Sequence, residues 1–98
     1  MTLDETRFHR LADAALAAIE DSLGESADVE ATEGVLTLDL DDGRRYVVNK
    51  HAPNREIWLA SPLSGAWHFA WDETSGRWLS TRGEDVALDD LLAREFAG

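Results

Sequence analysis

The stretch EIWLASPLSGAWHFAW, residues 56–71, has the alternation of two antiparallel β-strands joined by a short turn. Side chains on a strand point alternately to its two faces, so Ile57 and Leu59 share one face and Trp58 takes the other. The Pro62–Gly65 segment supplies the turn residues between the two strands. If Ile57 and Leu59 face the core, Trp58 faces solvent, although tryptophan has the largest apolar side chain.

The same period of two extends from residue 28 to residue 81. Turns at Glu33–Gly34 and Asp41–Gly43 separate the earlier runs, because glycine adopts positive φ without steric cost. Further turns at Pro53–Asn54 and Glu73–Gly76 separate the later runs. The short connections predict an antiparallel sheet of about six strands, within residues 28–32, 35–40, 40–50, 56–61, 66–71 and 77–81.

Helical spacing replaces this alternation at both ends of the chain. Apolar residues recur every three or four positions within 3–23 and again within 88–96. Thr2 and Glu5 match a capping box at the start of the first helix, and Gly24 is a residue type that commonly ends one. We therefore expect an amphipathic helix before the strands and another after them.

A helix, a run of strands and a helix can form a compact domain in few ways. Each helix must bury an apolar stripe, which is most readily done if both helices pack on one face of the sheet. The sequence therefore predicts a single α+β domain over residues 1–98, an α-β-α two-layer sandwich. The other face of the sheet, which would carry Trp58, is left in water.

The composition narrows the classes of function. The net charge of −11 argues against nucleic acids and anionic membranes as partners, because both are bound by clustered Lys and Arg side chains. The 98 residues include no cysteine, which excludes disulfides and thiolate metal sites supplied by this chain alone. No apolar run approaches the roughly 20 residues of a membrane helix, and the first ten residues lack the apolar segment of a signal peptide. We expect a cytoplasmic protein, with the mitochondrial matrix as the alternative location.

Acidic residues are concentrated within positions 1–33, where only Arg7 and Arg10 oppose them. These acids, called the acidic band below, are Asp4, Glu5, Asp13, Glu20, Asp21, Glu25, Asp28, Glu30 and Glu33. Carboxylates at i,i+4 spacing repel one another, and those at a helix C-terminus oppose the macrodipole. The band is therefore either a solvated, solubilising face or a weak, salt-sensitive surface with several cation sites. In the second case, the imidazole of His9 would favour transition metals.

Trp58 is expected to share the exposed sheet face with Asn49 and His68. Three interpretations of Trp58 stay open. It is a sheet-edge residue covered by a loop, part of a second small cluster, or the anchor of a protein interface with a polar rim. His51 and His68 are accompanied by no nucleophile or metalloprotease motif. The pattern therefore does not favour a catalytic role for either histidine.

Several segments of the chain resemble the frataxin family, including its bacterial members. They are DETRFHRLAD (4–13), NKHAPNREIWLASPLSG (49–65), the aromatic strand ending at Trp71, and GRWLS…LDDLL (76–92), which together cover nearly the whole chain. The resemblance implies the same α-β-α sandwich. It also implies an iron-binding accessory protein of iron–sulfur cluster assembly.

The resemblance also assigns roles by position. It implies weak, surface-bound iron, as Fe(II) or Fe(III), at Glu5, His9, Asp13, Asp21, Glu25, Asp28 and Glu30, and the helical wheel places Glu20 on the same flank. It implies that the sheet face docks a cysteine desulfurase and the iron–sulfur scaffold protein through Asn49, His51, Ile57, Trp58 and His68. The implied state is a monomer, with iron-dependent oligomers as an alternative.

The chain departs from the family pattern in three places. His68 stands where eukaryotic members carry arginine, which leaves open whether the desulfurase is activated or inhibited. Ala87 stands where the family tends to have a serine cap, and unless Asp85 replaces that cap the loss costs about 0.5–2 kcal/mol. The chain stops at Gly98, whereas longer relatives lay a tail over the groove between the helices. We therefore expect marginal stability that rises with salt or divalent cations.

Two rival functions stay open. A ferroxidase or iron store would need a di-iron site of the Glu-x-x-His type between helices, and neither predicted helix carries that motif. Enzymatic activity is therefore not expected, although it is not excluded. A purely acidic adaptor would instead bind a basic protein surface through the acidic band, with incidental metal affinity.

Overall fold

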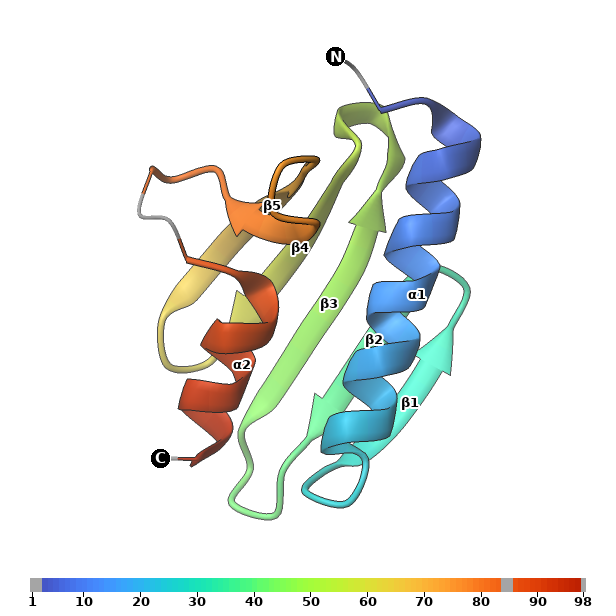
Figure 1. Ribbon diagram of the computed structural model, residues 1–98. Coiled ribbons are helices and arrows are strands. Elements are labelled where there is room, and N and C mark those ends of the chain that lie inside the picture. The colour runs from blue at the N-terminus through green and yellow to red at the C-terminus, as the bar shows by residue number, and fades with distance from the viewer. Residues whose placement is uncertain (1–2, 84–85, 98) are drawn as a thin grey trace.

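A computed structural model describes residues 3–83 and 86–97, within which the chain forms two α-helices, one 3-10 helix and a six-stranded sheet (Figure 1). The elements in chain order are α1 (Glu5–Leu23), β1 (Asp28–Thr32), β2 (Val35–Asp39), β3 (Arg45–His51), η1 (Ala52–Asn54), β4 (Glu56–Ser61), β5 (Gly65–Asp72), β6 (Arg77–Ser80) and α2 (Leu88–Ala97). The predicted order of elements is confirmed. The largest shift is at β3, which becomes regular only at Arg45, after the turn that ends at Gly43 (φ 92°).

The strands lie side by side in chain order, and each described neighbour pair is antiparallel. Trp58 on β4 lies opposite Asn49 on β3 and His68 on β5. Ile57 lies opposite Phe69. Because directly opposite residues share a face, Asn49, Trp58 and His68 form a row on one side of the sheet, while Ile57 and Phe69 point to the other.

Both α1 and α2 cover the same face of the sheet, with β3 visible between them (Figure 1). Their buried side chains meet the inward face of the strands in one core, which contains Phe8, Ala12, Leu16, Ile19, Leu36, Leu38, Tyr46, Val48, Ile57, Leu59, Trp67, Phe69, Trp78, Leu88, Leu91 and Leu92. The predicted α-β-α sandwich is confirmed. None of the described helices is long and apolar enough to cross a membrane.

The start of α1 differs from the prediction. The helix begins at Glu5, and the Asp4 carboxylate caps it by accepting a hydrogen bond from the Arg7 backbone N–H at 2.8 Å. The predicted cap residue, Thr2, lies outside the described residues. The helix does end at Gly24, but with φ −64° rather than a positive φ. Glycine is favoured there because a Cβ would lie 2.6 Å from the Glu20 carbonyl oxygen.

The segment before α2 extends along the edge of the sheet. Ser80 N–H donates to the Val86 carbonyl at 2.8 Å, and Ala87 forms an isolated antiparallel bridge with Leu79. Ala87 is only 2% exposed, so the small side chain fits a position that packs against β6. The predicted substitute cap, Asp85, lies outside the described residues.

The last turn of α2 is held by one carboxylate. Glu95 Oε1 accepts hydrogen bonds from Tyr46 Oη (2.9 Å) and Ser61 Oγ (2.6 Å), and Oε2 accepts one from Ser64 Oγ (2.5 Å). Burial alone would raise the pKa of Glu95, but these hydrogen bonds outweigh burial and lower it. Burial and the Glu95 contact raise the pKa of Tyr46 to about 12. Glu95 therefore ties α2 to β3 and to the turn between β4 and β5.

Candidate functional site

The N-terminal half of the acidic band lies on one flank of α1. Glu5, His9 and Asp13 follow one another at i,i+4 spacing and so lie about one turn apart. Their side chains are 67%, 39% and 61% exposed, respectively. These predicted metal ligands therefore share one exposed surface.

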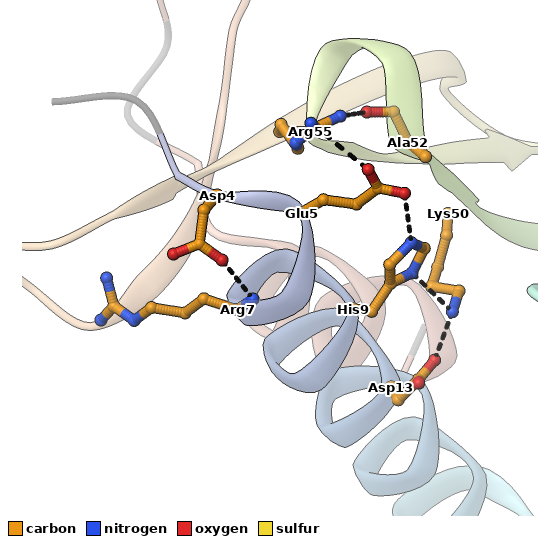
Figure 2. Close-up of polar contacts among 8 residues, drawn as sticks. All are labelled: Asp4, Glu5, Arg7, His9, Asp13, Lys50, Ala52 and Arg55. Carbon is orange, nitrogen blue, oxygen red and sulfur yellow. Dashed lines mark hydrogen bonds and ion pairs between the residues drawn. The ribbon is translucent and has the colours of Figure 1, made fainter.

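Two cations from the sheet side reach this flank (Figure 2). Lys50 Nζ lies 2.7 Å from Asp13 Oδ1 and 3.1 Å from His9 Nδ1. Glu5 lies between His9 Nε2, at 3.8 Å, and a guanidinium nitrogen of Arg55, at 4.0 Å. The two carboxylates carry −2 and the two cations +2, so the flank has no net charge when His9 is neutral.

The local backbone explains why these cations reach α1. Lys50 lies opposite Ile57, which is fully buried under the helices, so both side chains belong to the helix-facing side of the sheet. Arg55 follows η1 and is the only non-glycine residue among those described with a positive φ, 54°. Its N–H donates to the Ala52 carbonyl at 3.1 Å and closes this turn beneath α1. Neither cation is predicted from the sequence, although alternation along β3 from the buried Val48 places Lys50 on the helix-facing side.

The C-terminal half of the acidic band forms no such ion pairs among the described residues, although Arg45 is close enough to Glu30 to interact with it electrostatically. Its predicted metal ligands are all exposed: Glu20, Asp21, Glu25, Asp28 and Glu30. None of these carboxylates forms an ion pair with any residue in the described ranges. The structure therefore divides the acidic band into a half that is neutralised by ion pairs and a half that forms none among the described residues.

Across residues 3–83 and 86–97, no three His, Asp or Glu side chains converge closely enough to hold a metal ion. Exposed carboxylates can still bind a hydrated cation, because water molecules complete the coordination shell. The donor set of the acidic band therefore fits a loosely held ion with oxygen ligands and does not form a chelating centre.

The opposite face of the sheet carries a stack of three rings, His51, Trp58 and His68. The His51 and Trp58 rings are 3.6 Å apart between centroids and inclined by 9°, and the Trp58 and His68 rings are 4.2 Å apart and inclined by 8°. Trp58 Nε1 donates to Glu56 Oε1 at 2.8 Å, and the same oxygen lies 3.8 Å from His68 Nδ1. Trp58 is half-buried, although the sequence predicts an exposed indole, because imidazoles cover both faces of its ring.

One predicted docking residue must be corrected. Ile57 is 0% exposed and belongs to the core under the helices, because it alternates with Trp58 along β4. Its side chain is not available to a partner. Asn49, His51 and His68 are half-buried beside Trp58. The Nδ1 atom of His51 is itself buried, and it has no hydrogen-bond partner among the described residues.

The fold and these two surfaces define an α+β sandwich domain with an acidic first helix and an aromatic patch on the open face of its sheet. Residues 1–98 match the family model described as a frataxin-like domain. The chain belongs to this family. The predicted family resemblance is thereby confirmed.

Named relatives and solved structures agree with this family assignment. The chain is 41% identical over 97 residues to the iron–sulfur cluster assembly protein CyaY of Pseudomonas putida strain W619, covering 96% of this chain and 86% of that protein. Trimeric frataxin from the yeast Saccharomyces cerevisiae, complexed with ferrous iron, is 39% identical, with a TM-score of 0.76 and coverage of 99% and 87%. Frataxin from Psychromonas ingrahamii is 26% identical, with a TM-score of 0.81 and coverage of 97% and 90%.

Proposed function

We propose that this protein is an accessory protein of iron–sulfur cluster assembly that binds iron weakly and docks on the assembly machinery. The observation that carries the proposal is membership of the frataxin family over the full chain, together with bacterial relatives that bear the name iron–sulfur cluster assembly protein. Those relatives also support a cytoplasmic location in a bacterium. Iron is the cargo of such a protein.

Iron binds first at the C-terminal half of the acidic band. Glu20, Asp21 and Glu25 end α1 and the turn after it, and Asp28 and Glu30 belong to β1. Exposed oxygen donors that form no ion pair with a described residue attract Fe(II) or Fe(III), but each site lacks the converging ligands of a tight centre. Binding is therefore weak, occurs at several sites and declines with salt. The yeast relative complexed with ferrous iron supports the choice of metal.

The ring stack docks the complex of cysteine desulfurase and iron–sulfur scaffold protein. Its indole is held by two imidazoles and by a hydrogen bond to Glu56. An aromatic anchor that is already fixed loses little conformational entropy on binding. Asn49 beside the stack supplies part of the polar rim that surrounds interface anchors. The protein acts as a monomer, and the trimeric yeast relative makes iron-dependent oligomers an alternative.

A purely acidic adaptor is the second candidate, because the exposed carboxylates in the C-terminal half of the acidic band would also suit a basic protein surface. The deciding experiment is cysteine desulfurase turnover with and without this protein, repeated with and without Fe(II). An iron-dependent effect of the protein supports the proposal, whereas the same effect in iron-free reactions supports the adaptor. No effect in either condition would refute a role at the desulfurase.

The acidic band can be tested in the same assay. The triple variant Glu20→Gln, Asp21→Asn, Glu25→Gln removes three negative charges and keeps the side-chain shapes. We expect it to abolish the iron-dependent effect. The double variant Glu33→Gln, Asp41→Asn changes exposed acids outside the predicted iron sites and controls for two of the three charges removed. Loss of partner binding by the triple variant even without iron would indicate the adaptor.

A further inference from the structure

Lys50 occupies the position that a metal ion would need between His9 and Asp13 (Figure 2). We infer that its ammonium is an internal competitor that withholds these two ligands from iron and directs the first ion to the C-terminal half of the acidic band. The inference rests on the proposed iron binding, but it can fail independently.

The position of Lys50 is built into the fold. Its N–H donates to the Gly34 carbonyl at 2.9 Å, and its side chain is only 14% exposed. The stem passes Gly34, where an added Cβ would already lie 3.6 Å from Lys50 Cε. A lysine held in this way differs from a surface lysine that samples many rotamers. The ammonium therefore stays close to α1.

The contact also decides the tautomer of His9. A lysine ammonium can only donate hydrogen bonds, so His9 Nδ1, 3.1 Å from Lys50 Nζ, must be the acceptor. The proton of the neutral ring then resides on Nε2, which lies 3.8 Å from Glu5 Oε1.

Both ring nitrogens are consequently closed to a metal ion. The lone pair of Nδ1 is engaged by Lys50, and Nε2 carries the proton. Freeing Nε2 would move that proton to Nδ1, where it would point at the ammonium. Metal ligation by His9 therefore requires Lys50 to move away, whichever nitrogen is used.

The positive charge of Lys50 also disfavours metal binding at His9 and Asp13. The ammonium of Lys50 is paired with Asp13 at 2.7 Å, so a divalent cation at His9 or Asp13 would have to displace it or bind beside it. A divalent cation about 5 Å from a single positive charge in watery surroundings is repelled enough to weaken binding about tenfold. No described cation forms an ion pair with Glu20, Asp21 or Glu25, so this penalty is absent there.

The test removes the ammonium and keeps the stem, with Lys50→Met. The matched control is Arg94→Met, which makes the same change in charge at an exposed position on α2. The C-terminal end of α2 lies at the opposite end of the molecule from the start of α1 (Figure 1). Co²⁺ serves as an air-stable divalent probe with similar ligand preferences to Fe²⁺. Calorimetry gives its affinity, and paramagnetic broadening of the His9 ring signals reports its location, with His51 and His68 as internal references.

In the wild type, the first Co²⁺ should broaden amide signals within residues 20–30 and spare the His9 ring. In Lys50→Met, we expect an added site about tenfold tighter than any site at His9 in the wild type, with early loss of the His9 ring signals. His9→Ala in the Lys50→Met background should remove the added site. Arg94→Met should behave as the wild type. If Lys50→Met does not fold, Lys50→Gln replaces it.

The outcomes separate this inference from the proposed function. If the wild type binds Co²⁺ within residues 20–30 and Lys50→Met gains nothing, the role of Lys50 is refuted and iron binding stands. If only Lys50→Met binds Co²⁺, the role of Lys50 stands and iron binding by the native acidic band is refuted. If neither protein binds, or if the first wild-type ion already broadens the His9 ring, the inference is overturned.

Discussion

Trp58 and His68 lie opposite each other on β4 and β5, with ring centroids 4.2 Å apart and ring planes inclined by 8°. His51 covers the other face of the indole at 3.6 Å. The faces of the indole are therefore already occupied within this chain, and its edge remains for a partner. A partner that docks here must contact the imidazoles as well as the indole.

Trp58→Ala should weaken binding to the desulfurase–scaffold complex by about 1–2 kcal/mol or more, because interface anchors of this type dominate binding energy. The fold should persist, since the ring stack lies outside the buried core. Surface plasmon resonance gives the affinity, and far-UV circular dichroism checks the fold. Leu63→Ala is the control, because Leu63 is 57% exposed and lies outside the stack. Equal binding by Trp58→Ala and the wild type would remove Trp58 from the interface.

The order of helices and strands could be predicted because both helices and most strands bury residues at a regular spacing. In α1 the buried residues recur every three or four positions, as the helical period predicts. In β4 buried residues alternate with more exposed ones, as the period of two predicts. Alternation also placed Trp58 on the open sheet face. The family position of Ile57 predicts a docking role against the alternation of its own strand, and the full burial of its side chain shows that this prediction is wrong.

The ion pairs and hydrogen bonds between elements could not be predicted from these periodicities. Lys50 and Arg55 meet α1 only through tertiary packing, and the left-handed φ of Arg55 has no glycine to signal it. Glu95 likewise appears as an ordinary helix acid in the sequence. Its buried hydroxyl partners, Tyr46 and Ser61, come from strands distant in the chain. Periodicity predicts the face of a helix or strand on which a residue lies. Its ion pairs and hydrogen bonds depend on which residues of another element pack against that face.

Asp4→Ala should lower the free energy of unfolding by about 1 kcal/mol, because it removes the side-chain acceptor from the N-cap of α1. Asp4 accepts from the Arg7 N–H at 2.8 Å. Urea denaturation followed by circular dichroism measures the change. Thr2→Ala is the comparison, and we expect it to be neutral because the helix starts at Glu5. The assignment of the cap to Asp4 would be wrong if Thr2→Ala cost as much as Asp4→Ala.

Glu95→Gln should destabilise the fold by about 1–3 kcal/mol at neutral pH, because the buried hydroxyl groups of Tyr46 and Ser61 and the exposed hydroxyl of Ser64 lose a charged acceptor. The pKa of Glu95 is lowered below its usual 4.5 in the folded protein. Its stabilising contribution is therefore complete above about pH 5 and is lost as the pH falls through the lowered pKa.

The gap in unfolding free energy between wild type and Glu95→Gln should shrink as the pH falls below 4.5, the ordinary pKa of this carboxyl group. Chemical denaturation at a series of pH values measures that gap. Glu33→Gln, at an exposed turn, provides a control with the same change in charge. A gap that stayed constant, or widened in acid, would contradict the role given to the Glu95 carboxylate.

Salt should raise the Tm, because the chain carries a net charge of −11 and the carboxylates of Glu20 and Glu25 form no ion pair with any cation in the described part of the chain. Screening becomes effective near 0.1 M salt, where the Debye length is about 10 Å. For a domain of this size, each 1 kcal/mol gained corresponds to about 4–8 °C. Calorimetric scans across a salt series measure the rise. The triple variant Glu20→Gln, Asp21→Asn, Glu25→Gln should start higher and respond less. A Tm that does not change with salt would exclude carboxylate repulsion as a determinant of stability.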